Sequence, residues 1–360
     1  MKYLILIFLA TSVAGLRYKF HRYLDRSHKH ENLIGSTYSA EMALGMLFVG
    51  AAGETAEELW RALNLTNRED VLGKFEDLQN MQPYTIEMFN YLLVNRKYKV
   101  KETYIKQVAQ YFEGVIDSVD MNNSKAVTSK VNKWVNDRTH GTVKKLMSYV
   151  GPDVNGILLN VLYFKGQWAK KFDPSLTQQD YFHVSDTKSI PVQMMVMRGR
   201  FRAERFFHLG IKVIELPFMK DGLVMLIYLP TSSDGLDELE EKIQESTLPQ
   251  ERQLVNLRLP KFRISTKTKL KSILNQFGIQ NLFSPAANLT GIVEDSNFHI
   301  DDVIQDAFIE INEDGIETAA VTGGRSPAMD FTANIPFAYV IRDSHEIYFQ
   351  GHVIEPEWDI

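Results

Sequence analysis

The chain has 360 residues, with 40 lysines and arginines, 45 acidic residues and a formal net charge of −5. This balance gives no reason to expect a nucleic acid or an anionic membrane as a partner. Cysteine is absent, which excludes disulfides, thiol catalysis and thiolate metal sites. Hydrophobic residues make up 44% of the chain and no linker interrupts it, so a single large domain can bury its core without covalent cross-links.

The first residues have the layout of a secretory signal peptide. In MKYLILIFLATSVAG one lysine precedes an apolar run, which ends in small residues at Ala14 and Gly15. The run is short for a membrane span, and the alternative is that it belongs to a buried first helix. We predict a signal peptide at 1–15 and a single domain at 16–360, in a secreted protein. Apolar residues at helical spacing in 16–24 predict that this domain opens with a helix.

The first half of the domain predicts helices around one long strand. Residues 42–49 are almost continuously apolar, which is typical of a buried helix, and 54–63 begin with acids that suit a helix N-terminus. Residues 85–95 alternate and are rich in β-forming residues, so we expect a central strand there. Residues 125–135 carry apolar side chains at helical intervals and predict an amphipathic helix lying on a flat surface.

Three sequons and one basic stretch stand out in the same half and beyond it. The sequons are candidate glycosylation sites of an exported chain. They begin at Asn64, Asn122 and Asn288.

Residues 96–101 are rich in lysine and would suit a sulfated polysaccharide, but a solvated sheet edge explains them better because acidic residues lie nearby.

Strands dominate the second half. Five segments have the pattern of half-buried or fully buried strands. They are 157–164, 213–217, 223–229, 254–262 and 308–311. Their mixed lengths and the lack of regular alternation with helices predict an α+β domain with large antiparallel or mixed sheets.

The segment 308–322 combines a buried-strand pattern with an uncharged run. It reads FIEINEDGIETAAVT, and Gly315 supplies freedom where the chain would have to bend or straighten. In an extended conformation the even-numbered residues from Ile316 share one face, and the odd-numbered residues from Glu317 share the other. The run can therefore lie exposed as a loop or be buried as a strand. An ordinary edge strand with a loop is the simplest interpretation from composition alone.

Sequence motifs of catalysis are missing. The chain has no G-x-S-x-G, no H-E-x-x-H and no Gly-rich phosphate loop. His28 and His30 lie two residues apart, where a solvated pair is a simpler explanation than a metal site. Trp168 and Asn160 have the residue types of a buried tryptophan with a hydrogen-bonding partner, which usually belong to a core. We predict a protein that is not an enzyme and needs no metal or cofactor.

Several sequence blocks, in order, resemble the serpins, the serine protease inhibitor family. The segment FIEINEDGIETAAVT is similar to the hinge and reactive loop of that family, and NVLYFKGQW and LKSILNQFGIQNLFSPAANLTGI are highly specific matches. Further blocks complete the series over residues 30–356: NLIGSTYSAEMALGMLFVGAAGET, VNKWVNDRTHGTVKKL and YFQGHVIEP. The resemblance implies the serpin fold, with three β-sheets, about nine helices and an exposed reactive loop near the C-terminus.

The resemblance also gives roles to individual residues. The hinge of the reactive loop would consist of Glu313, Asp314, Gly315, Ile316, Glu317, Thr318, Ala319 and Ala320. The residues that control opening of the main sheet, called the shutter and the breach, would be Ser36, Ser39, Asn160, Trp168 and Gln305. Two positions depart from the family pattern. Ile316 replaces a small residue at the first inserting position, and Gln305 stands where the family usually has a histidine.

The mechanism implied by the resemblance is suicide trapping of a serine protease. The protease cuts the loop, forms an acyl-enzyme, and is carried across the molecule as the loop inserts into the main sheet. The family's spacing from Glu313 puts the reactive bond at Met329–Asp330, and the 14 residues from Ile316 to Met329 reach about 46 Å as a strand. That nearly spans a body roughly 50 Å across. The alternative bond, Arg325–Ser326, inserts ten residues, about 33 Å, and is expected to stop short.

The reactive residue also sets the expected partner. Met329 suits a chymotrypsin-like or elastase-like protease, whereas Arg325 suits a trypsin-like one. The loop between Gly315 and Phe331 is several residues shorter than is usual in the family, which opposes trapping. The rival function is therefore a non-inhibitory serpin that acts as a protease substrate, decoy or binding protein. In either case we expect a monomer.

Overall fold

The structure is a computed structural model that describes most of the chain. The described residues are 24, 28–65, 71–81, 86–219, 222–232, 235–236, 238–239, 243, 248–315 and 327–358. The predicted signal peptide and nearly all of the predicted first helix lie outside them.

Six α-helices and two short 3-10 turns occur in the described part of the chain. They are α2 (Thr37–Phe48), α3 (Gly53–Ala62), α4 (Val71–Met81), α5 (Glu102–Phe112), α6 (Ser124–Arg138), α8 (Lys271–Gln276), η1 (Pro174–Leu176) and η2 (Asn281–Phe283). Side chains fix where two of them begin. Ser36 caps α2 by accepting from the backbone N–H of Ser39 at 3.1 Å, and Asn123 caps α6 by accepting from that of Ala126 at 3.1 Å.

Five strands form the main sheet, in the order β10, β11, β4, β2, β3. Their bounds are β10 (Phe262–Lys269), β11 (Asp302–Ile311), β4 (Gly156–Lys165), β2 (Ile86–Asn95) and β3 (Val115–Val119). Strands β11 and β4 run parallel to each other. Strand β10 is antiparallel to β11, and β2 is antiparallel to β4. This sheet carries the candidate site.

A second sheet contains nine strands, in the order β1, β14, β13, β8, β7, β6, β9, β12, with β5 also pairing with β6. The bounds are β1 (Leu33–Gly35), β5 (Gln178–Ser185), β6 (Lys188–Phe206), β7 (Ile211–Pro217), β8 (Val224–Pro230), β9 (Arg252–Pro260), β12 (Met329–Thr332), β13 (Phe337–Arg342) and β14 (Ile347–Val353). The 19 residues of β6 pair first with β9 and then, from Arg202 on, with β7. If this sheet is divided within β6 at Arg202, it becomes two sheets, and together with the main sheet these are the three β-sheets that were expected.

Most predicted elements agree with the structure, and two boundaries were wrong. The expected strand 254–262 is two strands, because Pro260 ends β9, and Lys261 donates its backbone N–H to Gln193 before β10 begins. Since proline has no N–H of its own, it marks a natural end for a ladder. The expected strand 308–311 is only the end of β11, which begins at Asp302.

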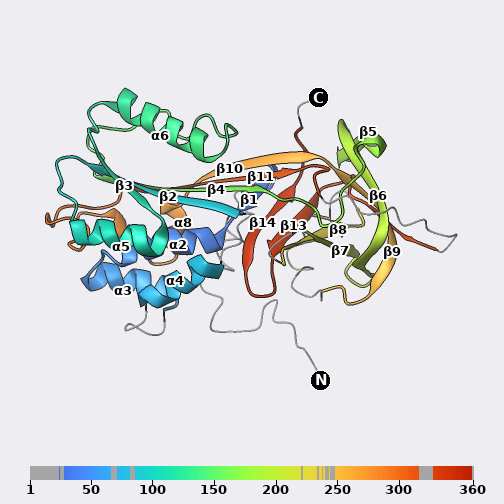
Figure 1. Ribbon diagram of the computed structural model, residues 1–360, viewed down its shortest axis with the longest axis horizontal. Coiled ribbons are helices and arrows are strands. Elements are labelled where there is room, and N and C mark those ends of the chain that lie inside the picture. Colours follow the sequence, from blue (N-terminus) through green and yellow to red (C-terminus); the bar gives the residue numbers. More distant parts are fainter. Residues whose placement is uncertain are drawn as a thin grey trace, which may run out of the picture.

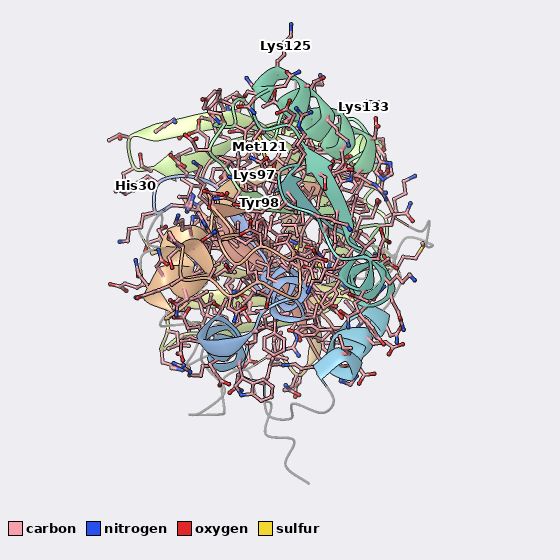
Figure 2. The ribbon with its side chains drawn as sticks, turned by 90° about the vertical axis from the view of Figure 1, so that its left-hand side faces the viewer. His30, Lys97, Tyr98, Met121, Lys125 and Lys133 are labelled. Atoms are coloured by element: carbon pink, nitrogen blue, oxygen red, sulfur yellow. The ribbon has the colours of Figure 1, made fainter. Side chains whose placement is uncertain are left out.

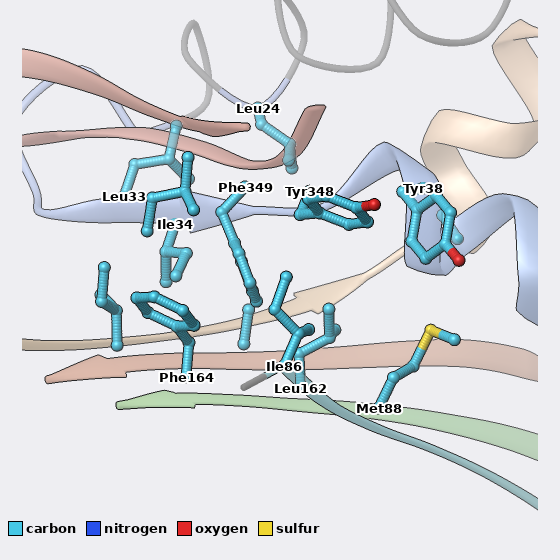
Figure 3. Close-up of a cluster of buried hydrophobic side chains, with 14 of the residues drawn as sticks. Leu24, Leu33, Ile34, Tyr38, Ile86, Met88, Leu162, Phe164, Tyr348 and Phe349 are labelled. Atoms are coloured by element: carbon cyan, nitrogen blue, oxygen red, sulfur yellow. The ribbon is translucent and has the colours of Figure 1, made fainter. Parts of the chain in front are cut away.

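The elements form layers on both faces of the main sheet. Figure 1 shows α6 above that sheet, α2 to α5 gathered below and to the left, and β5 to β9 at the right-hand end. Below the sheet, α2 is buried along almost its whole length, as its apolar sequence predicts. Figure 3 shows the core here, where Phe164 of β4 faces Phe349 of β14 with ring centroids 5.7 Å apart.

Above the sheet, one face of α6 packs on β2, β4 and β11. Val127, Val131 and Val135 of α6 are buried, and Trp134 lies over Tyr91 with ring centroids 4.7 Å apart. The amphipathic helix predicted at 125–135 therefore covers a flat sheet, as expected.

Asp306 is an acid buried in this upper layer. It lies between Ile304 and Phe308 on β11, is 4% exposed and accepts a hydrogen bond from Ser265 Oγ at 3.1 Å. Burial raises its pKa to about 6 from the ordinary value of 3.8, although Ser265 and nearby Lys267 act in the opposite direction. The folded protein therefore holds this proton more tightly than the unfolded chain does.

We expect Asp306→Asn to stabilise the protein above pH 6 and to have little effect near pH 4. A folded-state pKa above the unfolded value means that stability is lost as pH rises from about 4 to about 6, by up to roughly 3 kcal/mol for a shift of this size. Urea unfolding of both proteins at pH 4 and pH 8 measures this. The exposed control Asp153→Asn should leave the pH dependence unchanged. Identical pH profiles for wild type and Asp306→Asn would show that the buried carboxylate carries no penalty.

Candidate functional site: the β11–β4 seam and its hinge

The seam between β11 and β4 is the central feature of the site. Nine register pairs join the strands, from Asp302 opposite Ile157 to Glu310 opposite Lys165. The chain leaves β11 at Ile311 and reaches Gly315 at the same end of the seam. A segment that turned back there would run antiparallel to both β11 and β4 and could pair with each of them. Antiparallel pairing is slightly more stable per residue than the parallel pairing that it would replace.

A buried hydrogen-bond network lies at the middle of this seam. Gln305 and Asn160 face each other in register, and Gln305 Nε2 donates to Asn160 Oδ1 at 2.9 Å. Asn160 Nδ2 donates to Ser39 Oγ at 2.6 Å and to Asn90 Oδ1 at 2.9 Å. Gln305 also accepts from the backbone N–H of Ser36 at 3.2 Å and donates to its carbonyl at 3.0 Å. All five residues are buried, so the network joins the two seam strands to the start of α2.

The structure brings four of the five predicted shutter and breach residues into this network and places Trp168 elsewhere. Asn90 was missed, although the sequence held a signal for it. It is a buried polar residue between the apolar pairs Met88–Phe89 and Tyr91–Leu92 of β2, and it lies opposite Asn160 in the sheet.

Trp168 lies at the end of the seam and holds the chain that follows β11. Its indole Nε1 donates to the carbonyl of Asn312 at 2.8 Å, and its backbone N–H donates to the carbonyl of Asp314 at 2.8 Å. The ring is buried and stacks on Phe218 at 4.6 Å. A Cβ at Gly315 would lie 2.5 Å from the Trp168 carbonyl oxygen, so only glycine allows this close approach.

Two ion pairs fix the charges at the hinge. Lys261 Nζ lies 2.9 Å from Glu313, which also accepts from Thr177 Oγ1 at 2.8 Å. Burial acts to raise the pKa of Glu313, but these hydrogen bonds outweigh it and hold the pKa below its ordinary value. Lys165 Nζ lies 2.9 Å from Glu310, and this hydrogen bond raises the pKa of Lys165. The lowered pKa keeps Glu313 ionised at neutral pH, and the raised pKa keeps Lys165 protonated.

Trp358, near the C-terminus, lies against the side chains of Lys261 and Arg263, which nothing in the sequence had indicated. Lys261 Nζ and the guanidinium carbon of Arg263 each lie 4.3 Å from its ring centroid, a distance typical of cation–π contacts. Arg263 in turn donates to Glu310 at 3.0 Å. A backbone bridge between Arg263 and Glu357 anchors this tail to β10. The end of the chain is thus coupled to the start of the reactive segment.

Comparison with known proteins identifies this architecture. The profile of the serpin (serine protease inhibitor) family matches residues 12–356. The chain belongs to the serpins. It is 39% identical to serine protease inhibitor 42Dd of Drosophila melanogaster, over 99% of this chain and all of the relative, and 31% identical to antitrypsin of Bombyx mori, over 91% and 88%. The crystal structure of Serpin48 from Tenebrio molitor matches with a TM-score of 0.86 and 28% identity, covering 96% of this chain and 97% of that one.

Family membership defines the class of activity. Serpins are protease inhibitors rather than enzymes, and these relatives are named as inhibitors. The partner of such a protein is a serine protease. The hinge residues Glu313, Asp314 and Gly315 lie at the end of the seam in this serpin, while the remaining predicted hinge residues, Ile316 to Ala320, lie outside the described part of the chain.

The two candidate reactive bonds fall in different places. Arg325–Ser326 lies outside the described residues. Met329–Asp330 lies within β12, which pairs in parallel with β9, Met329 standing opposite Val255. Asn256 Nδ2 donates to Asp330 Oδ1 at 2.8 Å, and Lys212 Nζ donates to the Asp330 carbonyl at 2.8 Å. A protease could bind this bond only after β12 had left the sheet.

The predicted surface sites are less distinctive. Asn64 and Asn122 are exposed and Asn288 is half-buried. In the basic stretch 96–101, Arg96 pairs with Asp120 at 2.9 Å and Lys97 packs over the Tyr98 ring; Figure 2 shows this face of the molecule. The described residues include no helix long and apolar enough to cross a membrane, and no group of three or more His, Cys, Asp or Glu arranged to hold a metal ion.

We expect Asn160→Ala to weaken the seam and to destabilise the protein by about 3 kcal/mol or more. The substitution leaves Ser39, Asn90 and Gln305 with buried polar atoms that have lost a partner, and each such atom costs about 1–3 kcal/mol. Urea unfolding measures the loss, with the exposed Asn122→Ala as a matched control. If both variants unfold at the wild-type urea concentration, the network does not hold the seam closed.

Proposed function

We propose that this serpin is a secreted inhibitor that traps a serine protease by inserting its cleaved loop into the β11–β4 seam. The observation that carries the proposal is the seam itself. Two parallel strands share one ladder, and the chain that follows β11 leaves the sheet at one end of that ladder. A returning strand would be antiparallel to both neighbours. It would form two hydrogen-bond ladders, one with β11 and one with β4, in place of the single ladder that joins them now.

The chemistry is that of the protease, and the serpin contributes the change of shape. The protease serine attacks the carbonyl of the reactive residue, the bond to the next nitrogen breaks, and the new amino terminus departs while the serine holds an acyl ester. Hydrolysis of that ester competes with insertion. Trapping requires that the seam open faster than water cleaves the ester.

The composition of the loop supports insertion. Thr318, Ala319 and Ala320 are small, so either face of an inserted strand would fit beneath α6 or above α2 without overpacking. Ile316 is larger but apolar, and its burial is favourable if the breach accommodates it. Glu317 is the only charged residue between Gly315 and Arg325.

Position and length support Arg325–Ser326 as the reactive bond in preference to Met329–Asp330. Arg325 lies four residues before β12 begins, whereas Met329 is already paired with β9. Ten inserted residues were expected to stop short because their extended length was compared with the diameter of the whole protein. The strand that they must pair with, β11, is itself ten residues long. A cut after Arg325 therefore leaves enough chain to line β11.

An arginine at the reactive position defines the target as a trypsin-like protease, whose specificity pocket holds a carboxylate. Cleavage at Met329 would instead indicate a chymotrypsin-like or elastase-like target. Secretion is supported by the signal-peptide layout of 1–15 and by the sequons at Asn64, Asn122 and Asn288. The functional unit in this proposal is the monomer formed by 16–360.

The rival function is that of a substrate or decoy, and the short loop favours it. Ten residues reach the length of β11 with none to spare, so insertion would end before the protease was carried beyond the sheet. Mixing the protein with trypsin, chymotrypsin and elastase distinguishes the two functions on a denaturing gel. A covalent complex supports trapping. Complete cleavage with no complex and no rise in unfolding temperature supports the decoy.

We expect Ala320→Glu to abolish the covalent complex while leaving folding unchanged. The proposed mechanism requires that a charge at this position be solvated before insertion and buried without a partner afterwards, which costs several kcal/mol. The readout is the ratio of complex to cleaved serpin on the gel. Ala126→Glu, on the exposed side of α6, is the matched control. Normal complex formation by Ala320→Glu would mean that the loop does not insert at this position.

We expect Arg325→Ala to eliminate the reaction with trypsin, because Arg325 is the only basic residue between Gly315 and β12. Intact mass of the released C-terminal peptide identifies the bond that the wild-type protein presents. A trypsin complex that survives the substitution, or a peptide beginning at Asp330, would assign the reactive bond elsewhere.

A further inference from the structure

A row of arginines lies on the exposed face of β6. Arg198, Arg200 and Arg202 alternate with buried residues, so all three point to the same side of the sheet. The row extends over about 14 Å. On the neighbouring strand β9, Arg252 stands directly opposite Arg202. Like charges opposite each other destabilise a sheet, so this arrangement is unfavourable for the folded protein by itself.

Acidic partners are scarce at three of these arginines, Arg200, Arg202 and Arg252, within the described part of the chain. Arg202 lies 3.4 Å from Glu215, with half of its side chain exposed. Arg200 and Arg252 form no ion pair with any residue in the described part of the chain, and both are exposed. The other acid on this face of β6, Glu204, lies beyond Arg202 on the side away from Arg198. A local electrostatic cost that the fold does not compensate is expected at functional surfaces.

The same face continues to the strand that follows the reactive loop. Arg198 of β6 lies opposite Asn256 of β9, and Asn256 lies opposite Asp330 of β12. Asp330 is exposed on this face and is only five residues beyond Arg325. A protease bound to the chain just before β12 would therefore come to lie close to the arginine row. Figure 1 shows β6 and β9 together at one end of the molecule, away from α2 to α6.

We propose that Arg198, Arg200, Arg202 and Arg252 form an auxiliary docking surface for acidic side chains on the target protease. The inference rests on the proposed function, since it deepens how that protease is recognised. Arginine forks bind carboxylates in a bidentate manner. Opposite charges at the rim of an interface speed the encounter rather than prolong the complex. The surface selects, among proteases that accept the reactive residue, those with an acidic rim.

A sulfated polysaccharide is the other polyanion that such a row could attract. The row favours a protein because it is short and because it is continuous with the strand beside the cleavage point. Its arginines are about 7 Å apart along the strand, which is also the spacing of alternate side chains on an extended acidic segment. Binding of heparin to these arginines is therefore one of the results that the test distinguishes.

The test is the rate of attack by trypsin, chymotrypsin and elastase on wild type and on the double variant Arg200→Gln/Arg252→Gln, at 50 and 300 mM NaCl. With at least one protease, the wild-type rate constant should exceed that of the variant by about tenfold at low salt, and the difference should shrink at high salt. The ratio of complex to cleaved product should not change. Lys99→Gln/Lys125→Gln, at two exposed lysines outside β6 and β9, removes the same charge and should react like wild type.

Three results would overturn the proposal. Equal rates and equal salt dependence for wild type and the arginine variant with all three proteases would show that the row does not dock them. An equal loss in the lysine control would reduce the effect to net charge. Heparin binding that depends on the arginines, with protease rates unchanged, would assign the row to a polysaccharide.

Failure of the proposed function is a separate result. If wild type is cleaved without forming a complex, trapping is contradicted, yet the rate constant for cleavage still reports on docking. Slower cleavage of Arg200→Gln/Arg252→Gln at low salt would then support the docking surface on a protein that acts as a substrate.

Discussion

The contact between β11 and β4 is the interaction on which the rest of the structure depends. It closes the main sheet with parallel strands, although the chain beyond β11 is able to offer an antiparallel partner for both of them. Gln305 and Asn160 hold the contact from within, and Ser36 and Ser39 tie it to the start of α2. Because these polar groups are buried, opening the seam requires that they exchange partners together. The network therefore acts on the barrier to opening as well as on stability.

The tail around Glu357 and Trp358 lies at the hinge end of this seam and links the hinge to distant segments. Lys261 holds Glu313, Arg263 holds Glu310, and both cations lie against Trp358. The residues that would have to move first during insertion are thus held by β10 and by the C-terminal tail. Trp168 adds two hydrogen bonds to the backbone of the same stretch. The hinge is therefore held at its base, from Asn312 to Asp314.

The short loop gives β12 a larger role than sequence spacing suggests. Met329 and Asp330 are part of the sheet, so in the proposed function a protease would have to bind the chain between Gly315 and β12. A protease bound there would come close to the exposed face of β6 and β9. A short loop and an adjacent charged surface are therefore compatible features, since recognition lost from the loop can be supplied by its surroundings.

The sequence by itself pointed to the family through resemblance of several blocks to the serpins. It also determined the α+β class and most elements, because apolar patterns such as those of α2, β2 and α6 depend on local spacing. It also identified Ser36, Ser39, Asn160 and Gln305, through resemblance to the serpins. Only the tertiary structure decided that Asn90 joins them, that Trp358 covers Lys261 and Arg263, and that Met329 belongs to a strand. These contacts join residues far apart in the chain, and their geometry depends on strand register and on packing between layers. A pattern along one segment carries no information about which distant segment will lie against it.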